Sequence, residues 1–109
     1  MADPDLVYIE ARDLLAAFRA RSLSPVEAME AVIARAEAVE PVVNAFPHTH
    51  FDRAMEEARR AEARYGGADG GPRPLEGLPV AIKASAPVAG EPAERGSLAL
   101  RGMRAERTS

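Results

Sequence analysis

The feature that most constrains this chain is that only one of its segments resembles a β-strand. Residues 78–84 (LPVAIKA) form a short apolar run that predicts a buried strand, and Pro79 is tolerated near the beginning of a strand. A single strand cannot pair its own backbone N–H and C=O groups and is not stable alone. We therefore expect an α/β fold in which residues 78–84 are the first strand of a larger mixed sheet, so that the 109 residues are an incomplete part of it.

Three helices are predicted before this strand. In residues 9–21 apolar side chains recur at helical spacing, with charged residues on the opposite face. A second helix is expected over residues 25–40, where Ser24, Pro25 and Glu27 form a capping-box pattern and Pro41 is expected to end the helix. A third helix is expected over residues 52–65, which contain opposite charges four positions apart and are followed by two glycines.

Charge and composition exclude several classes of protein. The net charge of −3 provides no basic surface for nucleic acid, and the absence of cysteine rules out disulfides and thiolate metal sites. The N-terminus lacks the apolar segment of a signal peptide, and no stretch approaches the roughly 20 apolar residues that span a bilayer. We expect a cytoplasmic protein that binds neither nucleic acid nor membrane.

Two other segments contain residue types that bind ligands in other proteins. His48 and His50 lie two positions apart without a third ligand nearby in sequence, so solvated loop residues are expected rather than a metal site. The glycine-rich residues 66–71 have no strand before them and no G-K-[ST] after them, which favours a flexible linker over a phosphate loop. We expect no metal and no cofactor.

Lys83 is the only lysine in the chain, because the other basic residues are all arginine. One interpretation is structural: its stem covers apolar surface while the ammonium reaches water or an acidic partner, and the arginine bias reflects codon composition. The other interpretation is chemical. Arginine stays protonated, whereas a desolvated lysine can lose its proton near neutral pH and act as a base.

The segment L-E-G-L-P-V-A-I-K, followed by V-A-G-E-P and R-G-S-L-A-L, resembles the beginning of the amidase-signature hydrolases. In that family a G-[VIL]-P-[VIF]-x-x-K-D strand contains the catalytic lysine, and a G-x-P-T-T-x-G-S stretch comes after it. Upstream, S-L-S-P-V-E-A-M-E is similar to the family's paired helices, and Glu40-Pro41 with Asn44-Ala45-Phe46 is similar to its N-P-x-x-N-A-F connection. The resemblance covers residues from about 8 to 106, which makes residues 1–109 the N-terminal part of an amidase-signature domain.

The resemblance implies an activity on carboxamides. Members of the family hydrolyse or transfer the acyl group of small amides through a Ser–Ser–Lys triad, and Lys83 matches the lysine that acts as base through a bridging serine. A hydroxyl nucleophile needs an adjacent base, and lysine serves as one when burial depresses its pKa towards neutrality. The apolar neighbours of Lys83 are expected to provide that burial.

The chain departs from the family pattern in three ways. Ala84 replaces the aspartate after the lysine, and Ala93-Glu94 replaces the paired threonines. The two serines of the triad lie further downstream in the family, and neither Ser85 nor Ser97 matches them. We therefore expect a truncated product that is inactive alone.

An alternative is a non-catalytic helical interaction module derived from the family. In either case, helical surface left exposed by an incomplete fold favours self-association or a partner subunit.

Overall fold

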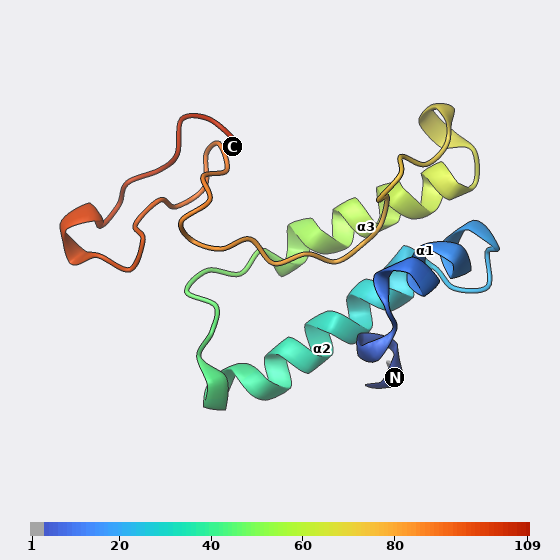
Figure 1. The fold of residues 1–109 in the computed structure, drawn as a ribbon, viewed down its shortest axis with the longest axis horizontal. Helices are drawn as coiled ribbons and strands as arrows, with labels where there is room; N and C mark the ends of the chain where they lie inside the picture. The colour runs from blue at the N-terminus through green and yellow to red at the C-terminus, as the bar shows by residue number, and fades with distance from the viewer. Residues whose placement is uncertain (1–3) are drawn as a thin grey trace. The chain divides into compact units, whose positions relative to one another are not determined.

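Helices form most of the N-terminal part of the chain (Figure 1). The computed structural model describes residues 4–109, which divide into the units Met1–Pro79 and Val80–Ser109. The first unit contains the 3₁₀ and α-helices η1 Pro4–Tyr8, α1 Ala11–Arg19, α2 Pro25–Val43, α3 Phe51–Tyr65 and η2 Ala68–Gly70. The second unit contains the 3₁₀ helix η3 Leu98–Leu100. The three long helices lie within a few residues of the predicted ranges 9–21, 25–40 and 52–65.

Helices α2 and α3 lie side by side, and small side chains fill their contact (Figure 1). The buried hydrophobic residues of these two helices are all alanines: Ala28, Ala31, Ala36, Ala58 and Ala61. Alanine lets two helices approach closely but removes little apolar area from water. Larger side chains of α2, such as Val32 and Ile33, are only half-buried.

The larger apolar side chains of the core come from α1. Phe18 is fully buried, and its ring lies 5.6 Å from that of Tyr65 in a tilted arrangement. Leu23 and Leu78 pack against the same cluster. The cluster therefore joins α1 to the neighbouring helices and to the segment after η2; its fully buried members are Leu14, Leu15, Phe18 and Ala28.

The beginning of α2 has the capping box that its sequence predicts. Ser24 Oγ accepts a hydrogen bond from the Val26 N–H (3.0 Å), and the Glu27 carboxylate accepts one from the Ser24 N–H (3.3 Å). These bonds satisfy N–H groups that have no partner within the helix. The Ser24 hydroxyl also donates to the carboxylate of Glu62 in α3, so the cap links two helices.

The prediction that Pro41 ends the second helix is wrong, because α2 continues to Val43. A proline removes only its own N–H donor, and the helix can continue when later groups compensate. Asn44 takes a left-handed conformation and donates its N–H to the Glu40 carbonyl (2.8 Å). The Glu40 carboxylate then accepts from the next two N–H groups, those of Ala45 (2.8 Å) and Phe46 (3.0 Å).

Residues 78–84 do not form the predicted strand. The architecture of residues 4–109 is helical, without a strand, and its one isolated bridge joins Pro92 to Arg104. Val80 and Ile82 are 77% and 60% exposed, so the run is not buried either. A strand needs a neighbouring strand to pair its N–H and C=O groups, and the described residues provide none beside this segment.

The unit Val80–Ser109 is held by backbone hydrogen bonds between its two ends. Gly90 N–H donates to the Ala105 carbonyl (2.8 Å), and the Ala105 N–H donates back to the Glu91 carbonyl (2.9 Å). The Ser109 N–H donates to the Pro87 carbonyl (2.9 Å). No residue from 80 to 109 is fully buried, so the unit has no hydrophobic core of its own.

The structure of residues 4–109 includes no helix with the length and apolar character needed to cross a membrane.

Candidate functional site

Lys83 lies on the exposed surface of the second unit. Its carbonyl accepts a hydrogen bond from the Ala86 N–H (2.8 Å), so a tight turn begins at the lysine itself. The expectation that apolar neighbours bury Lys83 is wrong for residues 80–109, because Ile82 beside it is mostly exposed. Without a paired strand, nothing in this unit holds the apolar run against a core.

The two serines nearest to Lys83 in sequence have local structural positions. Ser85 lies in the turn that Lys83 begins. Ser97 Oγ accepts a hydrogen bond from the Ala99 N–H (3.3 Å) and caps η3. The arrangement agrees with the sequence, in which neither serine matches a member of the triad.

A charged cluster precedes Lys83 in the chain, and sequence reasoning missed it. Glu76 is buried although its side chain is acidic. Its carboxylate accepts two hydrogen bonds from Arg73, Nη2 to Oε2 (2.8 Å) and Nε to Oε1 (3.1 Å), and one from Arg64 Nη1 to Oε1 (3.0 Å). We call Arg64, Arg73 and Glu76 the Glu76 cluster.

The Glu76 cluster strongly favours the charged form of its carboxyl group. The hydrogen bonds from Arg73 lower the pKa of Glu76 most; burial opposes them, the Arg64 guanidinium adds to them, and the result is a pKa of about 2 instead of 4.5. Burial meanwhile raises the pKa of the nearby Tyr65 hydroxyl. A buried carboxylate is stable only when its oxygens are paired in this way.

Backbone contacts hold the same segment against α1 and α3. The Tyr65 hydroxyl, at the end of α3, donates to the Glu76 carbonyl (2.7 Å). Arg19, at the end of α1, donates from Nη2 to the Pro74 carbonyl (3.1 Å). Two helices thus bind the main chain of this segment directly, in addition to the side-chain pairing of the Glu76 cluster.

Gly77 completes this attachment because no larger residue fits in its place. Its backbone has φ = 85°, a left-handed conformation that other residues rarely adopt. A Cβ atom at this position would lie 2.8 Å from Pro25 Cγ and 3.3 Å from Phe18 Cε2. The sequence signal that could have revealed the site is the acid placed between Leu75 and Gly77 in an otherwise apolar stretch, three positions after an arginine.

The histidine segment has a different setting. His50 precedes α3 and, together with Glu37, Asp52 and Arg53, lines a shallow pocket within the first unit. Within residues 4–109 the structure gathers no group of three or more histidine, cysteine, aspartate or glutamate side chains that could hold a metal ion. The glycine-rich residues 66–71 form the end of α3 and the short helix η2.

Comparison with known proteins identifies the family. The profile of the family described as Amidase matches residues 27–109. The chain is 42% identical over 90 residues to the A subunit of glutamyl-tRNA(Gln) amidotransferase from Chloroflexus aurantiacus (strain J-10-fl), and the match covers 82% of this chain and 18% of that protein. It is 40% identical over 79 residues to the protein of the same name from Geotalea daltonii, and that match covers 72% of this chain and 16% of the relative.

No solved structure matches the chain. The matched region amounts to less than a fifth of the length of either relative. The family match nevertheless includes the whole segment from Gly77 to Lys83 that resembles the catalytic strand. The chain belongs to the amidase family.

Proposed function

We propose that this chain provides the N-terminal helices and the lysine base of an amidase site that cleaves carboxamide C–N bonds. The observation that carries the proposal is the family match over residues 27–109, which contains Lys83, the chain's only lysine, in the G-L-P-V-A-I-K segment. Lys83 takes a proton from a bridging serine, which in turn takes the proton of the nucleophilic serine. Ser85 and Ser97 fill neither role, so both serines come from polypeptide outside these residues.

The exposure of Lys83 bears on how such a site works. A lysine acts as a general base near neutral pH only when it is desolvated. In residues 80–109 the lysine is exposed, so in this proposal its desolvation comes from polypeptide that covers the segment 78–84 and pairs with it in an α/β sheet. The 109-residue chain alone is then expected to be inactive.

The relatives' shared name describes one subunit of an amidotransferase acting with glutamyl-tRNA(Gln). By analogy, we propose that this chain acts on a small amide and works together with a partner subunit. The second candidate function is a non-catalytic helical interaction module. The hydrophobic core within residues 4–79 favours it, since these helices have packed structure without the catalytic segment.

A chimera separates the two functions. The N-terminal region of the C. aurantiacus relative is replaced by this chain, and release of ammonia from a primary carboxamide is compared with that of the unmodified relative. We expect an active chimera in which Lys83→Ala lowers kcat by about 10²–10⁴-fold, the usual contribution of a general base. Lys83→Arg should be as inactive, because arginine retains its proton.

Arg101→Ala is the matched control, because Arg101 is another exposed basic residue of the same unit. Full activity in Lys83→Ala would contradict the role of the lysine as base. An inactive chimera that is folded would favour the interaction module. Lys83-dependent turnover by the 109-residue chain alone would contradict the placement of both serines elsewhere.

A further inference from the structure

Among the described residues, Glu76 is the charged side chain that is buried, and the proposed triad does not use it. Burying a carboxylate is unfavourable unless it is fully paired, so a buried acid on a connecting segment needs an explanation. The Glu76 side chain is 5% exposed, whereas that of its partner Arg73 is 67% exposed. The pair thus fixes a connecting segment from its inner side, with the arginine reaching in from solvent.

We propose that the Glu76 cluster is a positioning element for the lysine base, which fixes the main chain at residues 76–78 and thereby sets where Lys83 can reach. This inference rests on the proposed function of Lys83. Glu76 touches neither substrate nor reacting atoms in this proposal; it acts through the segment that connects it to the lysine.

The cluster attaches the segment to the helices through independent contacts. Arg64 belongs to α3, Arg73 belongs to the connection after η2, and both meet on one carboxylate. Beside them, the Tyr65 hydroxyl holds the Glu76 carbonyl, and Leu78 packs on the core. Beyond Leu78 the burial ends, since Val80 is 77% exposed. Leu78 is therefore the last residue of the segment that the first unit holds in its core.

The distance along the chain makes this attachment matter for catalysis. Lys83 comes five positions after Leu78, a reach of at most about 17 Å for extended chain. A general base must come within about 2.6–3.2 Å of the proton that it takes. Misplacing a reacting group by about 1 Å can lower the rate by about 10²-fold, so releasing the fixed end of a short connection affects the base directly.

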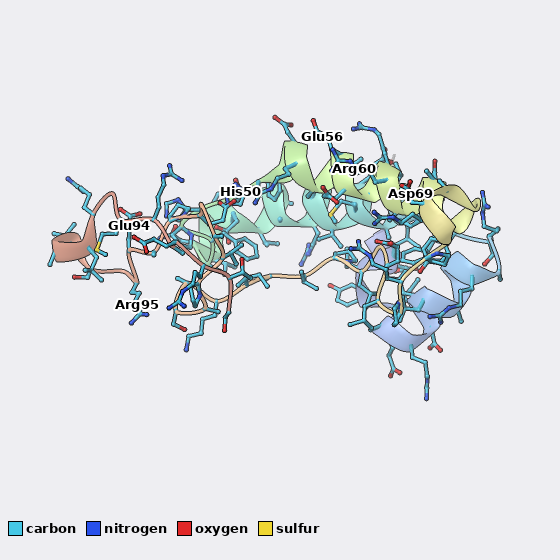
Figure 2. All side chains as sticks on the ribbon, turned by 90° about the horizontal axis from the view of Figure 1, so that it is seen from above. His50, Glu56, Arg60, Asp69, Glu94 and Arg95 are labelled. Carbon is cyan, nitrogen blue, oxygen red and sulfur yellow. The ribbon has the colours of Figure 1, made fainter. Side chains whose placement is uncertain are left out.

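A second ion pair of the same type provides a matched control. Glu57 and Arg60 lie three positions apart, as Arg73 and Glu76 do, with Arg60 Nη1 2.6 Å from Glu57 Oε1. Both side chains are more than half exposed, and Figure 2 shows Arg60 and Glu56 projecting from the side of α3 that faces away from α1. This pair joins two positions of one helix and holds no connecting segment. Glu57→Gln therefore repeats the chemical change of Glu76→Gln without releasing the chain before Lys83.

The test compares these variants in the chimera described above. We expect Glu76→Gln to lower kcat by about tenfold or more with KM nearly unchanged, because the base is misplaced while the substrate site is intact. Glu76→Asp, which keeps the charge, should recover part of the loss. Arg73→Ala removes an exposed side chain and leaves Arg64 in place, so it should give a smaller loss in a folded protein. Glu57→Gln should stay within about twofold of the parent, as expected for an exposed pair.

A second measurement uses the 109-residue chain and does not depend on activity. The Leu78 N–H donates to the Leu75 carbonyl (3.3 Å), and its hydrogen exchange reports on the attachment of the segment. Glu76→Gln should accelerate exchange at Leu78 by about tenfold while amides within α2 keep their rates, since local opening differs from global unfolding. Equal acceleration at both places would mean general destabilisation and would overturn the positioning role.

The outcomes distinguish this inference from the proposed function. If Lys83→Ala leaves turnover intact, the proposed function fails. If Lys83→Ala abolishes turnover but Glu76→Gln behaves like Glu57→Gln, only the positioning role of the Glu76 cluster is overturned. A loss of kcat in Glu76→Gln that matches the unfolded fraction of the protein, measured by circular dichroism, would also overturn it.

Discussion

In residues 4–79 the ring of Phe18 is fully buried, whereas in residues 80–109 the side chains of Val80, Leu98 and Met103 are 51–82% exposed. Both units contain many backbone hydrogen bonds outside regular helices. A hydrogen bond exposed to water contributes little net stability, since water competes for its partners, whereas burial of apolar area is the main stabilising term. We infer that the first unit has its own stability and that the second adds little to it.

The comparison also places the proposed chemistry. The residue proposed as base, Lys83, belongs to the unit without a core, and its nearest buried charge in sequence, Glu76, belongs to the unit that has one. The packed helices therefore define a fixed end for the segment, and the exposed unit presents the functional group. Four substitutions or conditions, each with a counterpart elsewhere in the chain, test this division.

The largest effect is expected from Phe18→Ala. Truncating a fully buried phenylalanine leaves a cavity beside Tyr65, and we expect the free energy of unfolding to fall by about 3–5 kcal/mol. The counterpart, Leu98→Ala in the second unit, should change it by less than about 0.5 kcal/mol, because Leu98 is 82% exposed. Urea unfolding followed by circular dichroism at the helical band measures both. Equal effects would contradict the division into packed and unpacked units.

The second comparison uses two glycines with nearly the same backbone conformation. Gly77 has φ = 85° and Gly90 has φ = 81°, but only at Gly77 would a Cβ meet other atoms. We expect Gly77→Ala to lower the free energy of unfolding by about 2–3 kcal/mol, from left-handed strain and from overlap with Pro25. Gly90→Ala introduces only the conformational strain and should leave the unfolding of the helices unchanged. A tolerated Gly77→Ala would mean that the segment is not held against Pro25 and Phe18.

The third comparison is one of pH, and it concerns Glu76. Its pKa is lower in the folded protein (about 2) than the ordinary value of 4.5, so its stabilising contribution is complete above about pH 4.5 and is lost as the pH falls towards 2. The groups that face it are Arg73, Arg64 and, through Arg64 Nε at 4.0 Å, Asp69. We expect a contribution on the order of 2 kcal/mol at pH 6, after allowing for solvent screening at the exposed guanidinium.

This pH dependence is measured as the difference in the free energy of unfolding between the unmodified chain and Glu76→Gln. The difference should be largest near pH 6 and should shrink towards zero near pH 2. The same difference for Glu57→Gln should be small at every pH, because that ion pair is exposed. A difference for Glu76→Gln that is constant with pH would show that the carboxylate charge is not what stabilises the segment.

Local sequence signals predicted the helices well, because caps and periodicity act within a few residues. The pattern around Ser24 predicted the beginning of α2, and its two capping bonds are present. Pro41 misled because the rule that proline ends a helix takes no account of the residues around it: Asn44 and the Glu40 carboxylate satisfy the groups beyond the proline. Helix ends depend on side chains whose orientation a residue pattern does not specify.

The strand and the Glu76 cluster failed for a different reason. The apolar run at residues 78–84 predicted burial, but burial requires a partner surface that residues 4–109 do not place beside it. Glu76 was overlooked because its partner Arg64 lies twelve positions away, so that only the folded chain brings the two together. For the candidate site, the sequence identified the lysine by family resemblance, and the structure added how the segment before it is held.

The smallest effect is expected from the two serine caps, and it tests whether the units differ even in local contacts of the same kind. Ser24 accepts from an N–H group at the start of a 19-residue helix and also donates to Glu62, whereas Ser97 accepts from the Ala99 N–H at the start of a three-residue 3₁₀ helix. We expect Ser24→Ala to lower the free energy of unfolding by about 1 kcal/mol and Ser97→Ala by at most a few tenths. Thermal unfolding monitored by circular dichroism compares the two, with Ser22→Ala as a control for an exposed serine whose hydroxyl donates to the nearby Ala17 carbonyl. If Ser97→Ala destabilised the helices as much as Ser24→Ala does, residues 80–109 would contribute to the stability of the first unit, and the fixed end before Lys83 would no longer belong to the helices alone.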